Sequence, residues 1–427
     1  MTHEDAKLYI EEVSRTGSIL GLESIQNLMK ELDNVQDRLQ IIHIGGTNGK
    51  GSTGAFMEAV LIEAGYKVGR YTSPAVFEAF EVWRINRKNI DLVDYLACLE
   101  EVKNACERML KKGMAQPTVF EVETALAFVY FYKTKCDYVL LEVGMGGETD
   151  ATNLITKPVC SVLTSISMDH LQFLGNSLEE IAKVKAGIVK EGCPLVTSSL
   201  QKSEVLQVLK EACAKKQAKL FLSDMNLVKA VKETLSGSTY QQEELGTIEL
   251  QISGSYQIEN SNLALTVCKE ILKLPEKIIK EGLKKAYWPG RFEVVSENPL
   301  VILDGAHNED AAEKLAQTLQ KHFTKRRITY IIGVLADKEH EKILECLLPL
   351  AESVYTVTPP SIRALDGSVL AQEAESFGKR AVFCETIEKA AELALEEVKS
   401  AKTDALVAFG SLSYLSALKA ELYKDRG

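Results

Sequence analysis

Residues 41–52 read Ile41-Ile-His-Ile-Gly45-Gly46-Thr47-Asn48-Gly49-Lys50-Gly51-Ser52. An apolar run here enters a glycine-rich turn that contains one lysine, and a stretch with helical apolar spacing follows it. Such a turn points backbone N–H groups at an anion, the helix N-terminus adds its positive end, and the lysine supplies a mobile charge. The stretch therefore predicts a buried strand, a phosphate-binding loop and a helix.

The loop departs from the commonest phosphate-loop pattern at two positions. That pattern has a glycine five residues before the Gly-Lys pair and a hydroxyl directly after the lysine, whereas this chain has Ile44 and Gly51 there. The alternative is a tight turn that uses glycine only for its left-handed backbone. Four glycines around a lysine favour a nucleotide, and the residues expected to bind it are Thr47, Asn48, Gly49, Lys50, Gly51 and Ser52.

Short apolar runs alternate with longer amphipathic stretches from residue 39 onward. This alternation is typical of parallel strands joined by crossover helices. We therefore predict a doubly wound, mainly parallel α/β sheet that contains the phosphate-binding loop (P-loop). Strands are expected at residues 39–44, 68–71, 138–143, 159–166 and 195–197, and helices near 54–63, 92–110 and 118–132.

A second domain is expected because 427 residues exceed what one hydrophobic core usually organises. Residues 225–254 read as a small antiparallel excursion, and prolines and glycine in the segment from Trp288 to Pro299 mark a boundary near Ser296. Strands then recur at residues 300–303, 330–334, 353–357, 381–384 and 405–409. We predict an ATP-binding P-loop domain over residues 1–295 and a smaller Rossmann-like α/β domain over 296–427.

Composition excludes several classes of protein. A net charge of −10 argues against nucleic-acid binding, which needs a basic face. The N-terminus lacks the pattern of a signal peptide, and no apolar run reaches the ~20 residues of a membrane span. Nine scattered cysteines do not resemble a disulfide framework. We expect a cytoplasmic protein with reduced thiols and no membrane contact.

Acidic and histidine side chains follow the predicted strands of the first domain. Glu142 ends one strand just before a glycine-rich turn, and Asp169 and His170 follow the next strand. Open α/β sheets bind ligands at the carboxyl ends of their strands. A single histidine at a strand end is more often structural, so these residues are only candidate metal ligands.

Lys185 occupies an unusual position in the helix predicted after His170. A capping box from Ser177 to Glu180 marks the start of this helix. Lysine is usually a solvated surface residue, and it seldom lies within an apolar stripe without a partner. A functional or ion-paired Lys185 is therefore favoured over a surface role. The apolar residues expected on the same face are Leu178, Ile181, Ala182, Ile188 and Val189.

Polar residues near the predicted domain junction are weaker candidates. Asp304 and His307 follow a buried strand of the second domain, where Asp304 could instead cap the next helix. Asn260 and Arg291 lie near the junction between the domains, where cleft sites often form.

Taken in order, these segments resemble the folylpolyglutamate synthase and dihydrofolate synthase family, within the Mur-type ligases. The resemblance covers nearly the whole chain. The motifs that carry it are Gly46-Thr-Asn-Gly-Lys-Gly-Ser52, Tyr71-Thr-Ser73-Pro74, Thr118-Val-Phe120-Glu121, Glu142-Val-Gly-Met-Gly-Gly147, Asp150-Ala-Thr-Asn153, Asp169-His170, Lys185-Ala-Gly-Ile188 and Asp304-Gly-Ala-His-Asn308.

The resemblance implies roles for the candidate residues. The P-loop would hold the ATP phosphates, and Asn260, Arg291 and Asp304 would contact ATP. Two Mg²⁺ ions are implied, with Ser73, Glu142 and His170 as ligands. Lys185 would be carbamoylated and would supply a further metal ligand. Lys50, Lys185 and His307 would serve the reaction, His307 by orienting a substrate or phosphate.

The implied activity is an ATP-dependent ligase that adds L-glutamate to the terminal γ-carboxylate of folates through an acyl phosphate. Addition of L-glutamate to dihydropteroate is the closest rival within the family, and we expect a monomer in either case. Three alternatives remain: another Mur-type amino-acid ligase, a P-loop NTPase or kinase that forms no amide, and a nucleotide-sensing module without catalysis.

One segment departs from the family pattern. The usual run resembling Phe-Asn-Glu-Arg-Ile is replaced by Ala79-Phe80-Glu81-Val82-Trp83, so the arginine is missing at Val82. Arg84 lies two residues further on and would project to the same side if this stretch is a strand. We therefore expect Arg84 to take the place of the missing arginine.

Overall fold

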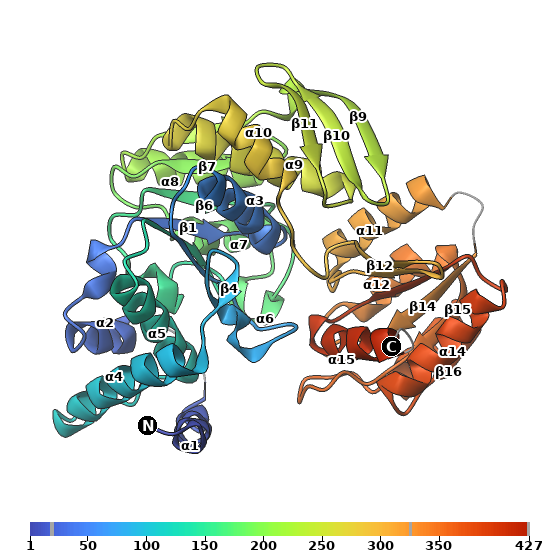
Figure 1. Cartoon of the computed structure of the whole chain (residues 1–427), viewed down its shortest axis with the longest axis horizontal. Helices are drawn as coiled ribbons and strands as arrows, with labels where there is room; N and C mark the ends of the chain where they lie inside the picture. Colours follow the sequence, from blue (N-terminus) through green and yellow to red (C-terminus); the bar gives the residue numbers. More distant parts are fainter. Residues whose placement is uncertain (18–20, 324–326, 425–427) are drawn as a thin grey trace.

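The computed structural model describes residues 1–17, 21–323 and 327–424, which form a larger and a smaller α/β part (Figure 1). The larger part contains a sheet in the order β4-β3-β2-β5-β1-β6-β7-β8. Its strands are β1 (Ile41–Gly45), β2 (Val68–Tyr71), β3 (Trp83–Ile85), β4 (Lys88–Asn89), β5 (Tyr138–Glu142), β6 (Cys160–Leu163), β7 (Leu195–Ser198) and β8 (Leu220–Ser223).

The strand order gathers the candidate site at one edge of this sheet. Strands β2, β5, β1, β6, β7 and β8 are parallel, whereas β3 and β4 are antiparallel additions beside β2. The P-loop follows β1, Glu142 ends β5, and His170 lies beyond the end of β6. Because these strands are neighbours, their carboxyl ends place the three features side by side.

Apolar residues alternate between the two faces of the sheet. Ile41 and Leu141 pack in one core with the helices α4 and α5, whereas Ile42 and Leu140 pack on the other face with α3. This alternation follows from the period of two along a strand. The helices of this part are α1 (His3–Ser14), α2 (Glu23–Lys30), α3 (Lys50–Glu63), α4 (Leu92–Lys111), α5 (Val119–Lys133), α6 (Leu171–Leu174), α7 (Leu178–Ala186), α8 (Ser203–Lys215), α9 (Ser255–Thr266) and α10 (Glu276–Lys284).

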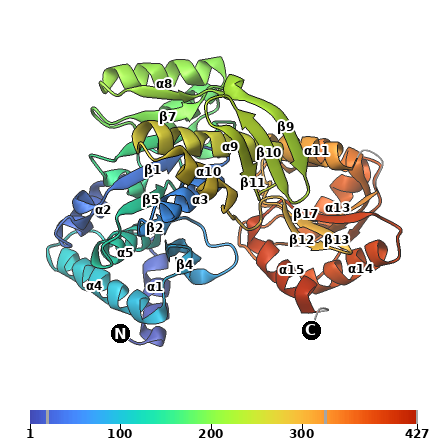
Figure 2. The ribbon, with the colours of Figure 1, turned by 45° about the horizontal axis from the view of Figure 1, so that its top comes forward.

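The predicted antiparallel excursion is confirmed as a three-stranded sheet in the order β11-β10-β9. Its strands are β9 (Val228–Thr234), β10 (Gly237–Gln242) and β11 (Gly246–Leu250). The turned view shows this sheet extending toward α11 (Glu309–His322) of the smaller part (Figure 2). An ion pair between Glu233 and Lys321, with 2.6 Å between Oε1 and Nζ, links the two.

The smaller part contains a sheet in the order β12-β13-β17-β14-β15-β16, in which only β12 is antiparallel to its neighbour within the described residues. Helices cover both faces of this sheet. Its strands are β12 (Glu293–Glu297), β13 (Leu300–Leu303), β14 (Ile328–Ile332), β15 (Ala351–Thr356), β16 (Ala381–Phe383) and β17 (Ala405–Phe409), and its further helices are α12 (His340–Leu347), α13 (Gly367–Ser376), α14 (Ile387–Lys399) and α15 (Leu412–Lys424).

The predicted α/β fold class is confirmed, although sequence patterns missed β3, β4, β8 and β12. Ser296 lies inside β12, which pairs with β13, so the second sheet begins a few residues before the proposed boundary. The division into residues 1–295 and 296–427 stays a prediction. Below, the first domain and the second domain denote the parts before and after residue 290.

Helix α7 is shorter than its apolar pattern suggested. It begins after the N-cap Ser177 and ends at Ala186, with Gly187 as the C-cap. Ile188 and Val189 therefore lie beyond the helix, but they pack in the same hydrophobic core as Ile181.

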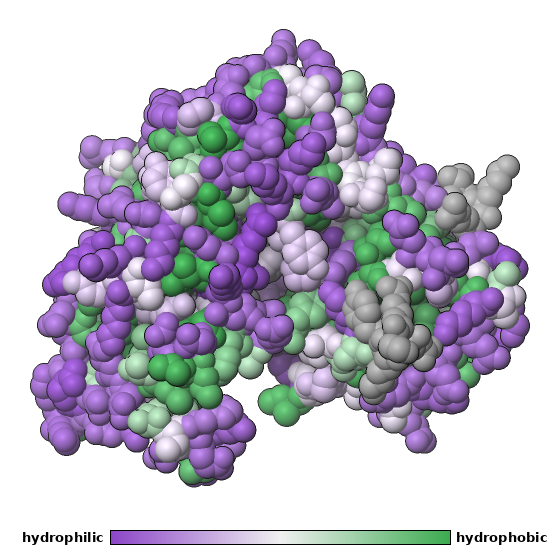
Figure 3. Space-filling view, viewed as in Figure 1, coloured by the Kyte–Doolittle hydropathy of each residue, from purple (hydrophilic) through white to green (hydrophobic). Residues whose placement is uncertain are grey.

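Hydrophilic side chains cover most of the face shown in Figure 3, which is hollowed between the two domains. Among the described residues, no helix is both long enough and apolar enough to cross a membrane.

Candidate active site

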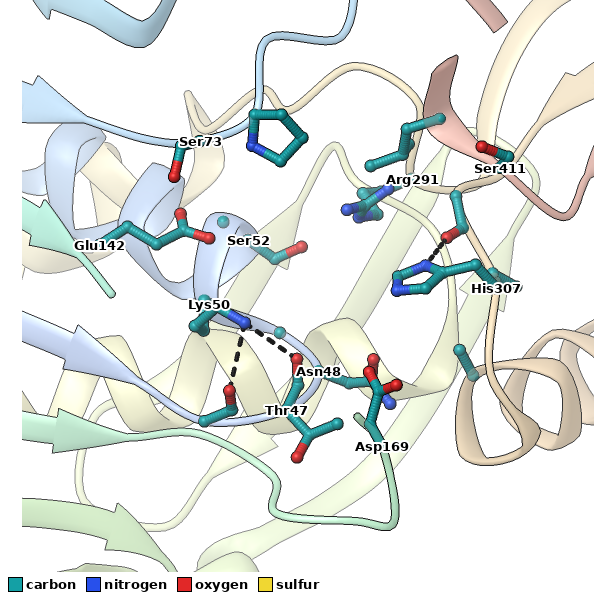
Figure 4. Close-up of a pocket in the computed structure, with 18 of the residues that line it drawn as sticks. Thr47, Asn48, Lys50, Ser52, Ser73, Glu142, Asp169, Arg291, His307 and Ser411 are labelled. Carbon is teal, nitrogen blue, oxygen red and sulfur yellow. Dashed lines mark hydrogen bonds between the residues drawn. The ribbon is translucent and has the colours of Figure 1, made fainter. Parts of the chain in front are cut away.

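A cavity of about 470 Å³ lies between the two domains. The first domain contributes the P-loop and the ends of β2 and β5, and the second contributes the segment after β13 (Figure 4). The predicted site residues that line it are Thr47, Asn48, Gly49, Lys50, Gly51, Ser52, Ser73, Glu142, His170, Lys185, Asn260, Arg291, Asp304 and His307. The structure therefore brings all the sequence-predicted site residues together.

The P-loop is held in a conformation that only glycine fits easily. Gly49 has a φ of 91° and is the N-cap of α3, and a Cβ atom there would lie 2.3 Å from Oδ1 of Asn260. The backbone N–H groups of Thr47 and Asn48 donate to the carbonyl oxygen of Ser165 at 2.8 and 3.3 Å. The first turn of α3 keeps N–H groups without intrahelical partners, as an anion site requires.

Lys50 bonds to its own loop. Its Nζ atom donates to the carbonyl oxygens of Gly46 and Thr47, at 3.1 Å each (Figure 4). Neither acceptor carries a full charge, so an anionic phosphate would be a stronger partner for this ammonium group. Lys50 is therefore available for the outer phosphates of a nucleotide.

Glu142 is a buried carboxylate at the end of β5. The residue is 9% exposed, and its carboxylate has no hydrogen bond to any described residue. Burial raises the pKa of this carboxyl, although Lys50 and Arg70 oppose the rise. A buried acid with unused oxygen atoms beside a phosphate loop is suited to a hard cation. Ser73 follows β2 and lines the same part of the cavity.

His170 is half-buried next to the cavity. Burial lowers the pKa of its imidazole to about 4, against the opposing charge of Asp169. The ring is therefore neutral at physiological pH, which is the form that binds metals. Within the described residues there is no group of three or more His, Cys, Asp and Glu side chains arranged to hold a metal. Phosphates and water would have to complete any metal shell here.

Lys185 is buried in α7 with 4% exposure. Its Nζ atom donates to the carbonyl oxygen of Gly46 at 3.0 Å, and no carboxylate of the described chain pairs with it. Burial, and then the charge of Lys50, lowers the pKa of its amine to about 7. The predicted location within an apolar stripe is confirmed, and the ion pair that sequence reasoning left open is not formed.

Both carboxylate oxygens of Asp304 accept hydrogen bonds. Its oxygen atoms accept hydrogen bonds from the backbone N–H of Phe292 at 2.7 Å, the N–H of Ala306 at 2.8 Å and the Tyr256 hydroxyl at 2.9 Å. It does not cap α11, because the N-cap of that helix is Asn308. Asp304 therefore joins α9 of the first domain to the strand end of the second.

His307 presents one ring nitrogen to the cavity (Figure 4). Its Nδ1 atom lies 2.7 Å from the carbonyl oxygen of Gly305, which can only accept, so Nδ1 carries the proton. Burial lowers the pKa of this histidine to about 4. Nε2 is therefore a hydrogen-bond acceptor. Arg291 packs closely over Gly305, where a Cβ atom would lie 1.7 Å from its Nη1.

Sequence reasoning gave no site role to Lys314 and Lys338, which line the cavity, or to Asn308, which follows the cavity residue His307. Asn308 bonds to the P-loop, Lys338 pairs with Asp169, and Lys314 lies 3.3 Å from the hydroxyl of Ser165. Lys338 follows shortly after β14, so the strand-end rule that identified Glu142 could have found it.

The expectation that the Arg84 side chain projects to the same side as Val82, in place of the missing arginine, was wrong. Val82 ends a 3-10 turn and is buried in the core with Trp83, whereas Arg84 projects to the opposite face. There its guanidinium lies 4.9 Å from the ring centre of Trp288, beside Arg70 at 4.0 Å. A turn in place of the assumed strand breaks the alternation on which the expectation depended.

Comparisons with known proteins agree with this geometry. The model of the Mur ligase middle domain matches residues 44–268, and that of the Mur ligase glutamate ligase domain matches residues 290–412. The chain is 36% identical over 365 residues to a dihydrofolate synthase/folylpolyglutamate synthase of Bacillus subtilis, covering 83% of this chain and 84% of that protein. It is 35% identical over 370 residues to a folylpolyglutamate synthase of Lacticaseibacillus casei, covering 84% and 86%.

Solved structures share the whole fold. Mycobacterium tuberculosis folylpolyglutamate synthase complexed with ADP matches with a TM-score of 0.89 and 29% identity over 99% of both chains. Escherichia coli FolC in complex with DHPP and ADP matches with a TM-score of 0.84 and 26% identity, over 99% of this chain and 98% of that one. The chain therefore belongs to the folylpolyglutamate synthase and dihydrofolate synthase family of Mur-type ligases.

Proposed function

We propose that this chain is a folylpolyglutamate synthase, an ATP- and Mg²⁺-dependent ligase that adds L-glutamate to the terminal γ-carboxylate of a folate through an acyl phosphate. One observation carries the proposal. A single cavity joins a P-loop with an available lysine, a buried carboxylate without a hydrogen-bond partner, and a buried unpaired lysine. The reaction of a plain NTPase or kinase would not require the buried unpaired lysine, Lys185.

The nucleotide would lie across the interdomain cavity. Its phosphates would bind the first turn of α3 and Lys50, which would exchange two carbonyl acceptors for charged oxygen atoms. Asn260 lies behind the loop, and Arg291 faces it from the domain junction. Asp304 would contact ATP only with oxygen lone pairs that its three donors leave free.

Glu142, Ser73 and His170 fit as ligands of Mg²⁺. The fit rests on the unused buried oxygen atoms of Glu142, and phosphates and water would complete the shell. Two ions are proposed, which would neutralise charge on the transferring phosphoryl group. A carbamate on Lys185, whose amine bonds the carbonyl oxygen of Gly46, would add an anionic oxygen ligand.

Carbamoylation of Lys185 is favoured by its surroundings. The reaction with CO₂ needs the neutral amine, and burial without a carboxylate partner favours that form. A carbamate would also replace the repulsion between the Lys185 ammonium and Lys50 with an attraction. ¹³C NMR of protein equilibrated with ¹³C-bicarbonate should show a carbamate signal that Lys185→Arg removes. A spectrum identical in both proteins would contradict this assignment.

The chemistry then has two steps. An oxygen of the folate γ-carboxylate attacks the γ-phosphorus, the bond to the β-phosphate oxygen breaks, and ADP leaves. The amine of L-glutamate next attacks the acyl carbon, and the C–O bond breaks to release phosphate. The neutral amine must lose a proton on forming the amide, and Nε2 of His307 is an acceptor that faces the cavity. His307 therefore suits the incoming amine better than an anionic phosphate.

A second activity, glutamate addition to dihydropteroate, is favoured by the names of the relatives. The Bacillus subtilis protein carries both activities in its name. The yeast relative, 34% identical over 354 residues, is named dihydrofolate synthetase.

We place the enzyme in the cytoplasm as a monomer. All nine cysteines are free, as a reducing compartment favours. Both walls of the cavity come from one chain, so the site requires no second subunit.

The test is a product assay with purified protein, ATP, Mg²⁺, labelled L-glutamate and either a reduced folate or dihydropteroate. We expect the acceptor to gain the mass of one or more glutamyl units. Comparing the rates with the two acceptors shows which of the two activities is stronger. ATP hydrolysis without a glutamylated product would instead support an NTPase. ATP turnover stimulated only by a uridine-linked precursor would support another Mur-type ligase.

A further inference from the structure

Two arginines lie opposite each other on the strands next to helix α3. Arg70 on β2 and Arg84 on β3 are direct partners in the antiparallel register, and we call them the arginine pair. Their guanidinium carbons lie 4.0 and 4.9 Å from the ring centre of Trp288. Like charges directly opposite in a sheet are destabilising. The arginine pair therefore lowers stability unless other groups compensate its charge.

Arg70 is compensated by the helix that follows the P-loop. Its Nη1 atom lies 2.9 Å from Oε2 of Glu58 in α3, and the two side chains are 1% and 3% exposed. Its Nη2 atom donates to the carbonyl oxygen of Gly51 in the first turn of α3, and a Cβ atom at Gly54 would lie 3.1 Å from the same nitrogen. The other oxygen of Glu58 accepts from the N–H of Arg87 at 3.1 Å. Arg70 is thus fixed against the start of α3.

Arg84 has no matching compensation. Its Nε and Nη2 atoms are buried and form no hydrogen bond with the described residues. Burial, and then the charge of Arg70, lowers the pKa of Arg84 to about 10, so the side chain is still a cation at physiological pH. A buried charge without a partner costs free energy. Arg84 therefore adds positive charge that the surrounding protein leaves uncompensated.

This charge lies close to the place where an anion is expected. Trp288 joins the arginine pair to the P-loop, because a Cβ atom at Gly51 would lie 2.8 Å from Nε1 of its indole. The N-terminus of α3 carries the positive end of the helix dipole, which repels further cations. Burial raises the pKa of Glu142 in the cavity, and both arginines are among the cations that oppose this rise. A polyphosphate at the first turn of α3 would offset the repulsion among these positive groups.

We propose that the arginine pair sets the preference of the P-loop for the more highly charged nucleotide, so that ATP is favoured over ADP. Arg84 supplies the uncompensated charge, and Arg70 is a positioning residue that holds the pair against α3. Neither arginine is among the described residues that line the cavity, so the pair acts at a distance. Weaker attraction for ADP would help this product to leave after phosphoryl transfer. The inference rests on the proposed function for the identity of the nucleotide.

The experiment measures nucleotide binding to the full chain by isothermal titration calorimetry with Mg²⁺. The ligands are a non-hydrolysable ATP analogue and ADP. Arg84→Met removes the charge and keeps an apolar side chain beside Trp288, whereas Arg84→Lys keeps the charge. Arg84→Met should bind the ATP analogue roughly 2- to 30-fold more weakly, the range for a charge near a helix terminus. Its loss for ADP should be smaller, and Arg84→Lys should stay close to wild type.

The melting temperature of the ligand-free protein distinguishes this role from a structural one. Arg84→Met should melt at or above the wild-type temperature, because a buried unpaired charge is removed. A residue that only supports the fold would show the opposite sign. Arg84→Gln removes the same charge and covers the case in which Arg84→Met does not fold.

The matched control is Arg87→Met, which makes the same change in net charge in the turn that follows β3. Arg87 is exposed, and its Nη2 atom donates to the carbonyl oxygen of Lys285 at 2.9 Å. Because solvent and salt screen an exposed charge, Arg87→Met should leave the affinity for the ATP analogue unchanged.

Unchanged affinity of Arg84→Met for the ATP analogue would overturn the proposal. Equal losses for the analogue and ADP, or equal losses in Arg84→Met and Arg84→Lys, would also overturn it, because they would indicate packing and not charge. Misfolding of both Arg84→Met and Arg84→Gln would make Arg84 a structural residue, with the same result.

Failure of the proposed function is distinguishable from failure of this inference. If the wild-type protein binds the ATP analogue but makes no glutamylated product, the ligase assignment fails, while the binding comparison still decides the role of Arg84. A wild-type protein that binds neither nucleotide would overturn both.

Discussion

The two walls of the cavity use their polar groups differently. On the first domain, Glu142 has no hydrogen-bond partner among the described residues, and Lys50 and Lys185 bond only backbone carbonyls. On the second domain, Asp304 has three donors and Lys338 has a buried ion pair. Glu142, Lys50 and Lys185 of the first wall therefore remain able to bind ligands. Asp304 and Lys338 of the second wall are already bonded, in part to Tyr256 and Asp169 of the first domain.

This difference predicts opposite responses to mutation. A buried charge without a partner lowers stability, so its removal should cost activity but not folding. A buried charge with a full set of partners leaves those partners unsatisfied when it is removed, so its loss should cost stability. The predictions below use this contrast, from the largest expected effect to the smallest.

Lys50→Met should cause the largest loss of activity among the variants of the first wall. It removes the charge that we place on the outer phosphates, so kcat should fall by about 10²- to 10³-fold, as for the loss of one electrostatic contact to a reacting group. Steady-state ligase kinetics measure this. Unfolding by urea should stay close to wild type, because Lys50 bonds only two loop carbonyls. A variant with wild-type kcat would contradict the role that we assign to Lys50.

Glu142→Gln should separate activity from stability. The apparent Mg²⁺ affinity, measured by titrating the ligase reaction, should fall by at least about 10- to 100-fold. The melting temperature should equal or exceed that of wild type, because the neutral amide escapes the desolvation that raises the pKa of this carboxyl. A marked fall in melting temperature would show that Glu142 has a structural role instead.

Asp304→Ala, on the second wall, should lower stability, in contrast to Glu142→Gln. It leaves the N–H groups of Phe292 and Ala306 and the Tyr256 hydroxyl without their acceptor. We expect the free energy of unfolding to fall by roughly 2 to 5 kcal/mol in urea titrations. Asp304→Asn, which retains one acceptor, is the matched control and should lose less. Equal stability of Asp304→Ala and wild type would abolish the contrast between the walls.

Lys185→Met should change the pH dependence of stability in CO₂-free buffer. The pKa of this lysine falls from 10.5 to about 7 on folding, so the unfolded chain binds more protons between these values. Wild-type stability relative to the variant should therefore rise between pH 7 and pH 10, by no more than about 1.4 kcal/mol per pH unit. Urea unfolding at several pH values measures the difference, and a falling difference would contradict the buried neutral amine.

Much of the first wall could be predicted from sequence because its chemistry is local. The P-loop, Glu142 and His170 each follow a strand with a recognisable apolar run. Lys185 was found because a lysine in an apolar stripe is rare. The short strands β3 and β4 were missed because two or three residues cannot show a period.

The second wall was less predictable because its contacts join residues far apart in the chain. Asn48 meets Asn308, and Asp169 meets Lys338, across intervals that no local pattern spans. Asp304 was expected at an ATP site, but its donors on Phe292 and Tyr256 become visible only when the domains are in place. The predicted direction of the Arg84 side chain was wrong for a local reason, because a 3-10 turn lies where a strand was assumed.

The most direct test of the proposed ligation follows the oxygen atoms. A folate carrying ¹⁸O in its γ-carboxylate is incubated with the enzyme, ATP, Mg²⁺ and L-glutamate, and the released phosphate is analysed by mass. Ligation through an acyl phosphate predicts one ¹⁸O atom transferred to phosphate for each amide formed. Release of unlabelled phosphate would contradict the acyl phosphate, and with it the role that we assign to the P-loop and its facing wall.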